Sequence, residues 1–314
     1  MKKFFIIFFG VLFLLALVIG QCNGDDTDED EEFDAEQEKM SFVDGSIQQE
    51  QESGSDNIDE NTNSETKEES TLEEHEIPNS TPEVNMSALE IPRLTINQPE
   101  QILVRAGYTT SYNNKTKNAN WVAWHLTKEH TSGNWSRDGI PYTVDTDVKG
   151  GRQELEDWYG HTLPIDHGHM CPAGDCKWSK DAMVQSFLLT NMCPQNSNLN
   201  RGDWEELESR CRGWARHYGE IFIACGPIFY NKAYQTIGDN KVGVPDAFYK
   251  VILCMSKTPK ALGFIYPNNG THHNMQYYVT TVDKVEETTG IDFFYNLPDD
   301  IENDIESIAN FKKW

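Results

Sequence analysis

The sequence predicts an α+β fold, because strand-like and helix-like segments follow one another without the regular alternation of a parallel α/β protein. Strands are indicated by three apolar runs at residues 221–225, 248–255 and 261–266, each bounded by Gly, Pro, Asn or Asp. A helix is indicated at residues 199–218, where apolar side chains recur every three or four positions and charged ones fill the opposite face. No internal repeat is visible.

The remaining elements follow from the same periodicities. Apolar density begins near Leu89, where we expect the folded domain to start. A helix is expected at residues 281–289, and Gly290, which is suited to a left-handed C-cap, is expected to end it. A strand is expected at residues 121–126, and residues 166–170 are expected at the end of a strand or in the loop after it. Further helices are expected at residues 179–186 and 301–314.

Charge is distributed unevenly along the 314 residues, whose formal net charge is −25. Residues 23–90 contain 24 Asp and Glu and two Lys, a net charge of 2 − 24 = −22. Residues 91–314 contain 22 Lys and Arg and 27 Asp and Glu, a net charge of −5. A segment so acidic and so poor in apolar residues cannot bury enough surface to fold. We therefore expect a signal peptide at 1–21, an acidic disordered tether at 22–88 and a folded domain at 89–314.

The N-terminus resembles an export signal of the lipoprotein type. Two lysines precede an apolar run at residues 4–19, which is short for a membrane span. Residues 17–22 (LVIGQC) resemble a bacterial lipoprotein box, which implies a lipid on Cys22; cleavage after a plain signal, or an uncleaved anchor, is the alternative. The acidic run at residues 25–32 resembles a surface-export signal of Gram-negative lipoproteins, or is an ordinary spacer. We expect an exported, outer-membrane surface lipoprotein.

Six cysteines remain in the domain, and an even number in an exported protein allows up to three disulfides. Cys225 and Cys254 lie in neighbouring apolar runs, so they form one expected group. A second group consists of Cys171, Cys176 and Cys193. Zinc bound by this second group is the alternative, although the paired two-residue spacings typical of zinc sites are missing.

The domain lacks the overall basic charge that is typical of nucleic-acid binders, in which Lys and Arg release counterions from phosphate. This mild acidity gives a pure polyanion-binding module little electrostatic support. Local basic candidates remain at Lys149, Arg152, Lys177, Lys180, Arg201, Arg210, Arg212 and Arg216.

Residues 166–208 combine the groups that phosphodiester hydrolysis needs: a base for water, charge compensation and help for the leaving oxygen. His169, in the sequence DHGH, is the expected general base because imidazole titrates near neutrality. The carbonyl oxygen of Asn200 is the expected direct ligand of Mg²⁺, which prefers hard oxygens; a helix N-cap is its alternative role. Glu208 lies too far along the helix to share that contact directly, so we expect it to reach the metal through water.

Four motifs occur in order along the domain. They are Asp166-His167-Gly168-His169, Asn191-Met192-Cys193-Pro194-Gln195, Asn198-Leu199-Asn200-Arg201-Gly202-Asp203-Trp204 with Leu207-Glu208, and Thr289-Gly290-Ile291-Asp292-Phe293-Phe294 with Leu297-Pro298. Together they resemble the DNA/RNA non-specific endonuclease family, over about residues 121–298. The resemblance implies a ββα-metal (His-Me finger) nuclease fold, with a central, mainly antiparallel sheet flanked by helices.

The resemblance also implies an activity and a set of roles. Members are Mg²⁺-dependent endonucleases that hydrolyse DNA and RNA with little sequence preference, and Mn²⁺ is an expected substitute. His169 matches the family's general base, Asn200 its metal ligand, and Glu208 the acid that contacts the metal's water. The expected partners are therefore DNA and RNA, together with the membrane through the lipid on Cys22; the sequence identifies no protein partner.

Four further residues complete the expected site. Arg137 lies where the family carries an arginine that steadies the pentacovalent phosphate. His167 and Arg201 are expected to contact substrate, as is Asn191, whose alternative role is to stabilise a turn. His167 departs from the family's motif, which usually has arginine there. Histidine loses its charge above about pH 6.5, so lower activity or an acidic optimum is expected.

Two other functions are compatible with this sequence. The main alternative is a catalytically weak or inactive surface lipoprotein that binds nucleic acid. The second is a phosphodiesterase that acts on small or damaged substrates. The presence of His169, Asn200 and Glu208 favours the endonuclease.

Overall fold

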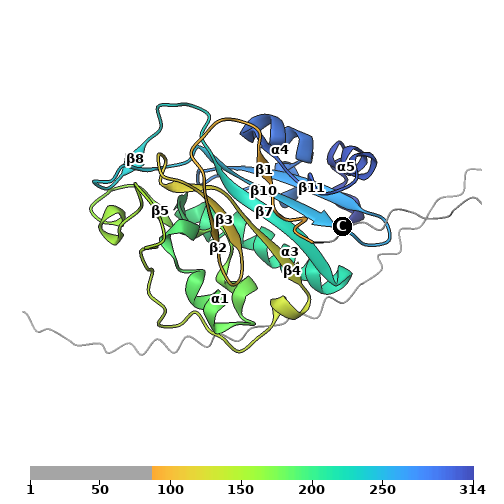
Figure 1. The fold of residues 1–314 in the computed structure, drawn as a ribbon, viewed down its shortest axis with the longest axis horizontal. Coiled ribbons are helices and arrows are strands. Elements are labelled where there is room, and N and C mark those ends of the chain that lie inside the picture. The colour runs from red at the N-terminus through yellow and green to blue at the C-terminus, as the bar shows by residue number, and fades with distance from the viewer. Residues whose placement is uncertain (1–86) are drawn as a thin grey trace, which may run out of the picture. The chain divides into compact units, whose positions relative to one another are not determined.

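The computed structural model describes residues 87–314, and a seven-stranded sheet lies at the centre of this part of the chain (Figure 1). Every neighbouring pair of strands in it is antiparallel. In spatial order the strands are β12 (Val279–Thr280), β11 (Lys260–Pro267), β10 (Ala247–Cys254), β7 (Glu220–Ile228), β4 (Asn118–Thr127), β3 (Thr109–Asn113) and β2 (Gln101–Val104). The predicted α+β class is confirmed. The expected signal peptide, and the expected tether up to residue 86, lie outside the described residues.

The central strands are buried on both faces, which explains why they read as continuous apolar runs. Successive side chains of a strand point to opposite faces. Along β7, Ile223 and Cys225 join one hydrophobic cluster, while Phe222 and Ala224 join another on the opposite face. The strands predicted from the three apolar runs are therefore confirmed as β7, β10 and β11.

Helices cover both faces of the sheet (Figure 1). α1 (Lys180–Gln185) and α3 (Asp203–Tyr218) pack on the face that carries Ile223, and α4 (Val282–Thr289) and α5 (Asp299–Glu306) pack on the other. Within the described residues, none of the helices combines the length and apolar composition that crossing a membrane requires.

Two short strands and two helices form a separate ββα unit beside the central sheet. β5 (Ile165–His169) pairs antiparallel with β6 (Met192–Asn196), and α2 (Ser197–Asn200) then leads into α3. Gly168 faces the side chain of Gln195, where an added Cβ would lie 2.4 Å from Oε1, so this close approach requires glycine. The unit brings the first and third sequence motifs together.

The other elements are short. β1 (Arg93–Leu94) pairs with β13 (Ile291–Asp292), and β8 (Thr236–Ile237) pairs with β9 (Val242–Gly243). Short 3-10 helices occupy Glu129–Thr131, Leu155–Trp158, Ala173–Cys176, Leu189–Asn191, Met275–Tyr278 and Phe311–Lys313.

Two helix predictions need correction. The helix expected at 199–218 is divided, because Gly202 has non-helical dihedral angles (φ −127°, ψ −109°) between α2 and α3. Asn200 therefore ends a short helix instead of capping the start of a long one. The helix expected at 301–314 stops at Glu306. The helix predicted at 281–289 is confirmed, and its cap Gly290 has the left-handed φ of 67°.

The expected disulfides are also wrong, since the six cysteines of the domain are all buried free thiols. Cys225 lies opposite Lys250 in the sheet, and Cys254 is four residues further along that strand, about 13 Å away at 3.3 Å per residue. The sulfurs of Cys171 and Cys176 are 3.9 Å apart and interact as thiols.

Candidate active site

His169 ends β5, and its imidazole lies in an aromatic pocket. The ring packs edge-on against Phe187 with 4.9 Å between ring centres, and it lies 6.1 Å from the ring of Tyr142. Only 9% of the residue is exposed, and Nε2 has no hydrogen-bond partner among the described residues. Burial, together with the neighbouring Arg137 and His167, lowers the pKa of His169 to about 3. The ring is therefore neutral at neutral pH, and its unpartnered nitrogen can accept a proton.

Arg137 contacts the same aromatic ring as His169. Its guanidinium carbon lies 5.7 Å from the ring centre of Phe187, and the residue is exposed to solvent. Arginine keeps its charge at any physiological pH. Since this charge helps to lower the pKa of His169, the fold brings the two expected catalytic residues close together.

Asp166 orients the expected metal ligand. The amide nitrogen of Asn200 donates to Oδ2 of Asp166 at 3.1 Å. Because a carboxylate only accepts hydrogen bonds, this contact fixes the direction of the amide, and no described hydrogen bond uses the carbonyl oxygen of Asn200. Asp166 was not assigned a role from the sequence, because its contact with Asn200 depends on how β5 and α2 fold together.

Arg201 binds the same carboxylate. Its Nε and Nη2 atoms donate to the two oxygens of Asp166 at 2.8 Å each, and 73% of its side chain stays exposed. Burial raises the pKa of Asp166, but hydrogen bonds from Arg201, Ser197 and Asn200 outweigh that effect and hold the pKa below its usual value. The carboxylate stays ionised, so it can fix Asn200 across the neutral pH range.

Glu208 lies on α3 and is partly buried. It is close to the charge of Lys250, a residue that was not among the expected site residues. Burial raises its pKa to about 7, and the nearby Lys250 and Arg212 oppose that rise. Lys250 is fully buried at the centre of β10, and its Nζ atom has no hydrogen-bond partner among the described residues. A lysine inside the apolar run at 248–255 was the available signal, because lysine is almost never fully buried without a reason.

Lys250 belongs to a buried polar cluster beneath α3. Its Nζ lies 4.4 Å from the ring centre of Trp204 and 5.3 Å from that of Trp124, which are cation–π contacts. Asp175 accepts hydrogen bonds from Trp124 Nε1 (3.0 Å) and Arg212 Nη1 (3.1 Å). Of these charges, Lys250 and Arg212 favour the ionised form of Glu208, whereas Asp175 disfavours it.

His167 is held in an aromatic stack. Its ring lies parallel to Tyr142 at 4.1 Å and to Trp158 at 3.9 Å between ring centres. Burial lowers its pKa to about 4, and the weaker effect of Asp166 does not reverse this. His167 therefore loses its charge at a lower pH than the 6.5 expected from the sequence. At neutral pH it offers substrate an uncharged ring.

Asn191 does not face the substrate side, which corrects the expectation that it contacts nucleic acid. The residue is fully buried, and its Oδ1 accepts from the backbone nitrogen of Cys171 at 2.9 Å. Its Nδ2 donates to the carbonyl oxygens of Cys171 and Ser186, each at 2.8 Å. The amide thus connects the segment after His169 to the end of α1. This structural role agrees with the alternative expectation, in which Asn191 stabilises a turn.

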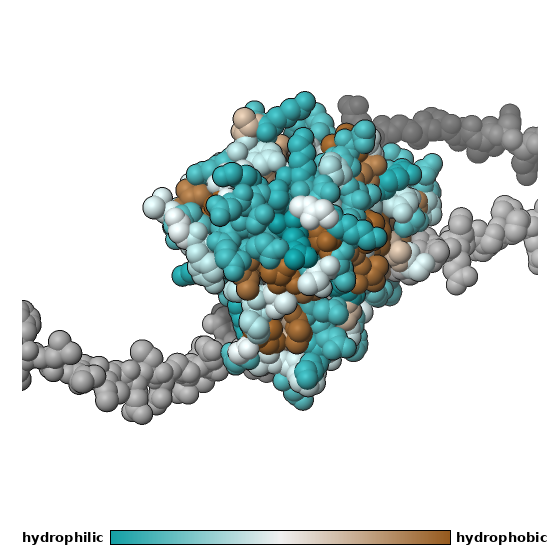
Figure 2. Space-filling model, turned by 60° about the vertical axis from the view of Figure 1, so that its left-hand side comes forward, coloured by the Kyte–Doolittle hydropathy of each residue, from teal (hydrophilic) through white to brown (hydrophobic). Residues whose placement is uncertain are grey.

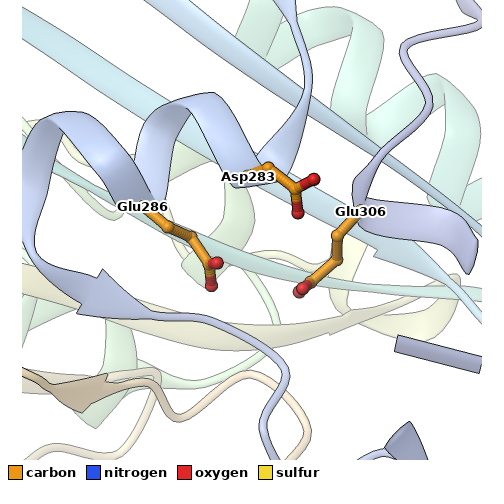
Figure 3. Close-up of side chains that lie close together, drawn as sticks. All are labelled: Asp283, Glu286 and Glu306. Atoms are coloured by element: carbon orange, nitrogen blue, oxygen red, sulfur yellow. The ribbon is translucent and has the colours of Figure 1, made fainter. Parts of the chain in front are cut away.

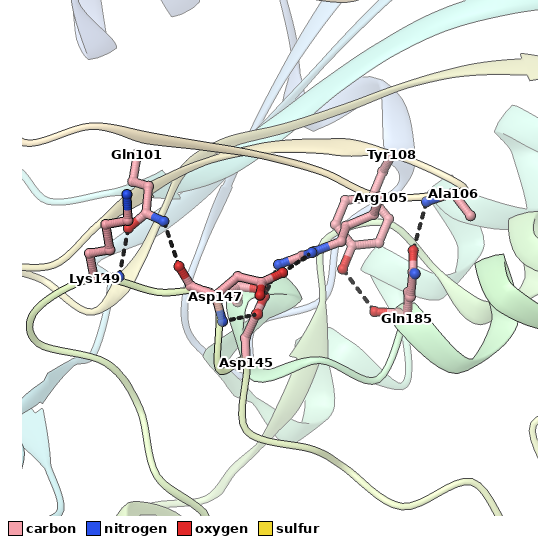
Figure 4. A network of polar contacts seen from close by, with 9 residues as sticks. Gln101, Arg105, Ala106, Tyr108, Asp145, Asp147, Lys149 and Gln185 are labelled. Atoms are coloured by element: carbon pink, nitrogen blue, oxygen red, sulfur yellow. Dashed lines mark hydrogen bonds and ion pairs between the residues drawn. The ribbon is translucent and has the colours of Figure 1, made fainter.

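A polar network fixes the loop that carries Tyr142 (Figure 4). Arg105, which follows β2, donates to Asp145 at 2.6 Å and to Asp147 at 2.7 Å. Asp145 is buried and also accepts from Thr190 Oγ1 at 2.6 Å. The ion pairs hold the loop after Tyr142 against β2 and β3, and so help to set one side of the stack around His167.

The side of the molecule that carries β5 and β8 in Figure 1 comes forward in Figure 2. This face is mostly hydrophilic, with hydrophobic residues gathered in patches near its middle and below. A polar surface of this kind suits contacts with sugar and phosphate more than burial of a large apolar partner.

Comparison with known proteins gives a consistent result. Residues 85–300 match the family model described as DNA/RNA non-specific endonuclease. "Nuclease EXOG, mitochondrial" of Mus musculus is 31% identical over 220 residues, which cover 65% of this chain and 59% of that protein. "Nuclease C1" of Cunninghamella echinulata var. echinulata is 35% identical over 212 residues, covering 62% of this chain and 83% of that protein.

A solved structure shows the same fold. The crystal structure of the EndoG/EndoGI complex contains a chain that matches with a TM-score of 0.60 at 25% identity, over 63% of this chain and 87% of that chain. This match confirms the ββα-metal arrangement expected from the sequence motifs. The chain spans about three fifths of the length of the mouse and Xenopus laevis EXOG relatives.

Proposed function

The chain belongs to the DNA/RNA non-specific endonuclease family, and from this premise we propose that it is a metal-dependent endonuclease that hydrolyses phosphodiester bonds in DNA and RNA. The observation that carries the proposal is the state of His169. Its ring is neutral, its Nε2 is unpartnered, and Arg137 shares its aromatic neighbour Phe187. A base and a permanent cation at one place are what water attack on a phosphodiester requires.

His169 would accept the proton of the attacking water at Nε2. The aromatic pocket excludes solvent from most of the ring, so the ring is held in one orientation and in its neutral form. Once protonated, the imidazolium is disfavoured by burial and by the nearby charge of Arg137, which promotes release of the proton afterwards. Arg137 would stabilise the extra negative charge of the pentacovalent phosphate.

The donor set fits Mg²⁺. Asn200 presents an amide oxygen that Asp166 orients, and Glu208 adds a carboxylate whose ionised form Lys250 and Arg212 favour. Oxygen donors of this kind suit Mg²⁺, and Mn²⁺ accepts the same ligands. Asn200 would hold the ion directly and Glu208 through its water, and the ion would supply charge stabilisation at the leaving oxygen. These assignments rest on the resemblance together with the geometry of Asp166.

Contacts with substrate would involve sugar and phosphate, which explains low sequence preference. Arg201 has an exposed guanidinium beside the metal ligand, and Arg137 has one beside the base. His167 is neutral in its stack, so it cannot replace the charge of the arginine usual at this position. This last observation favours one alternative, a catalytically weak surface protein that binds nucleic acid.

We also propose export and attachment to the outer membrane surface through lipid on Cys22. The support is the leader with its lipoprotein box and the acidic run after it. Several relatives carry "mitochondrial" in their names, and that word describes those proteins. Metabolic labelling with a palmitate analogue would show lipid on the wild-type chain and none on Cys22→Ala; equal labelling would overturn the attachment.

The experiment for the proposed activity uses supercoiled plasmid and a long RNA as parallel substrates. We expect both to be cut into oligonucleotides of decreasing length with Mg²⁺ or Mn²⁺, and neither to be cut with EDTA. Release of mononucleotides alone would instead indicate a phosphodiesterase for small substrates. Binding of both polymers without cleavage would establish the nucleic-acid-binding alternative.

A further inference from the structure

Three carboxylates converge on the face of the sheet opposite His169. Asp283 and Glu286 lie one turn apart on α4, and Glu306 is the last residue of α5 (Figure 3). One oxygen from each lies within 4.8 Å of those of the other two. The cluster joins two helices that are separated in sequence by β13 and the turn after it.

The innermost member of the cluster lacks a partner. Glu306 is only 4% exposed, and its Oε1 atom has no hydrogen-bond partner among the described residues. Buried carboxylate oxygens in native proteins are normally paired with a donor, a cation or a proton. In Figure 3 the Glu306 side chain extends from the end of α5 toward α4, and its carboxylate, which carries the unpartnered oxygen, lies beside those of Glu286 and Asp283.

No cation of the described chain neutralises these three groups. Lys284, the basic residue of α4, pairs with Glu287 at 2.7 Å, and Arg93 pairs with Asp292. The surrounding charges are mainly negative, because Glu302 and Asp292 also act on the cluster.

Burial and the neighbouring negative charges raise the pKa values of two members of the cluster. Burial, followed by Glu286 and Glu302, raises the pKa of Glu306 to about 9. Burial likewise raises the pKa of Glu286 to about 7, although the backbone N–H of Phe293 donates to it at 2.7 Å. Carboxylates this close cannot all be ionised at neutral pH unless a positive charge joins them.

We propose that Asp283, Glu286 and Glu306 bind one Ca²⁺ ion that fastens α5 to α4. Ca²⁺ takes oxygen ligands at about 2.3–2.6 Å, so two ligands of one ion lie at most about 5 Å apart. The three carboxylate oxygens, all within 4.8 Å of one another, are close enough to share one ion. Asp283 is exposed, which leaves room for the water molecules that complete the coordination of Ca²⁺. Three carboxylates together suit the larger and more flexible shell of Ca²⁺, whereas Mg²⁺ keeps most of its water molecules and is bound through one or two carboxylates.

The ion would stabilise the docking of the C-terminal region. Ile305, next to Glu306, packs in the cluster formed by Val282 and Val285 of α4. A cation shared by both helices would remove the repulsion that opposes this packing. The site lies on the other face of the sheet from the candidate active site, so it is independent of the proposed nuclease function.

The test measures Ca²⁺ binding to the full chain after removal of metals with EDTA. All proteins carry Asn200→Ala, which weakens the other expected metal site. Calorimetric titration with CaCl₂ and thermal unfolding with millimolar Ca²⁺ are compared for this parent, for Asp283→Asn, for Glu306→Gln and for Glu287→Gln. Glu287→Gln is the matched control, since it removes one carboxylate from α4 outside the cluster. NaCl at equal ionic strength controls for screening.

We expect one Ca²⁺ to bind to the parent and to Glu287→Gln, and to raise their melting temperatures. Asp283→Asn and Glu306→Gln should lose at least about tenfold in affinity and most of that rise. Without Ca²⁺, Glu306→Gln should melt no lower than the parent, because a carboxyl with a pKa of about 9 is already neutral at pH 7 and Gln is neutral too. Should this variant fail to fold, the exposed Asp283→Asn decides. Absent binding, binding that survives both substitutions, or an equal rise with Mg²⁺ would overturn the proposal.

Discussion

The ammonium nitrogen of Lys250 lies 4.4 Å from the ring centre of Trp204. The indole of Trp204 in turn donates a hydrogen bond to the carbonyl oxygen of His169 at 3.4 Å. Glu208 follows Trp204 by about one helical turn and is subject to the same buried charge. A single lysine on the central sheet therefore lowers the pKa of the expected acid and packs on the indole that bonds to the backbone of the expected base.

Replacing Lys250 with Met should shift the pH dependence of cleavage. Glu208 has a pKa of about 7 while Lys250 holds it down, so loss of the lysine raises that pKa further. The carboxylate would then be protonated at pH 7, and it would ionise only at higher pH. We expect about fivefold lower kcat at pH 7 for a pKa rise of one unit and about tenfold more for each further unit, with recovery above the new pKa.

The matched control for this substitution is Lys260→Met. Lys260 is on the neighbouring strand β11 and makes cation–π contacts with Tyr218 and Trp314, away from the site. Its pH profile should match wild type. A Lys250→Met profile that falls uniformly at every pH would show a structural effect alone.

Replacing His167 with Phe should make the protein more tolerant of acid. The folded-state pKa of His167 is about 4, below the ordinary value near 6.5, so the unfolded chain binds the proton more readily. Stability from this group is complete above about pH 6.5 and is lost as the pH falls toward 4. Phe keeps the stack with Tyr142 and Trp158 but cannot titrate.

Between pH 7 and pH 4 the wild type should lose about 2 kcal/mol more unfolding free energy than His167→Phe. This figure is smaller than the full pKa shift implies, because the ring is partly exposed and solvent screens its charge. Urea unfolding at both pH values measures it. An unchanged loss would show that folding does not lower the pKa of His167.

Replacing Asp166 with Ala should weaken metal binding. The carboxylate holds the amide nitrogen of Asn200, and without it the carbonyl oxygen is no longer oriented. Residues that orient a ligand typically contribute 10–100-fold in affinity, so the Mg²⁺ concentration for half-maximal cleavage should rise by about that factor. Asp181→Ala, an exposed change on α1, is the control. An unchanged Mg²⁺ requirement would remove the positioning role of Asp166.

Replacing Asn191 with Ala should destabilise the fold without changing substrate affinity. The change leaves the N–H of Cys171 and the carbonyls of Cys171 and Ser186 unpaired in a buried place. We expect about 3 kcal/mol lower unfolding free energy, with KM for plasmid near wild type. A raised KM at unchanged stability would restore the original expectation that Asn191 contacts substrate.

The sequence predicted the parts of the fold that repeat locally. β7, β10 and β11 were visible because both of their faces are buried, and α3 was visible because its apolar stripe has helical spacing. β3 (TTSYN) was missed because it is short and polar. The break at Gly202 was missed because a single glycine does not by itself interrupt a helical pattern.

Within the candidate site, residue types with rare chemistry were predictable and their environments were not. The motifs identified His169, Asn200 and Glu208, whose catalytic roles stay predictions. The aromatic stack around His167 depends on Trp158 and Tyr142, which come from separate loops. The charge of Lys250 reaches Glu208 only after a strand and a helix pack together.

The most direct test of the central claim is cleavage of supercoiled plasmid by wild type, His169→Ala and His217→Ala, each with Mg²⁺ and with EDTA. His217 is exposed on the last turn of α3 and controls for loss of an imidazole. We predict that His169→Ala loses about 10²–10⁴-fold in rate, that His217→Ala cuts like wild type, and that EDTA abolishes all cutting. If His169→Ala cuts plasmid at the wild-type rate, the assignment of His169 as the base is contradicted.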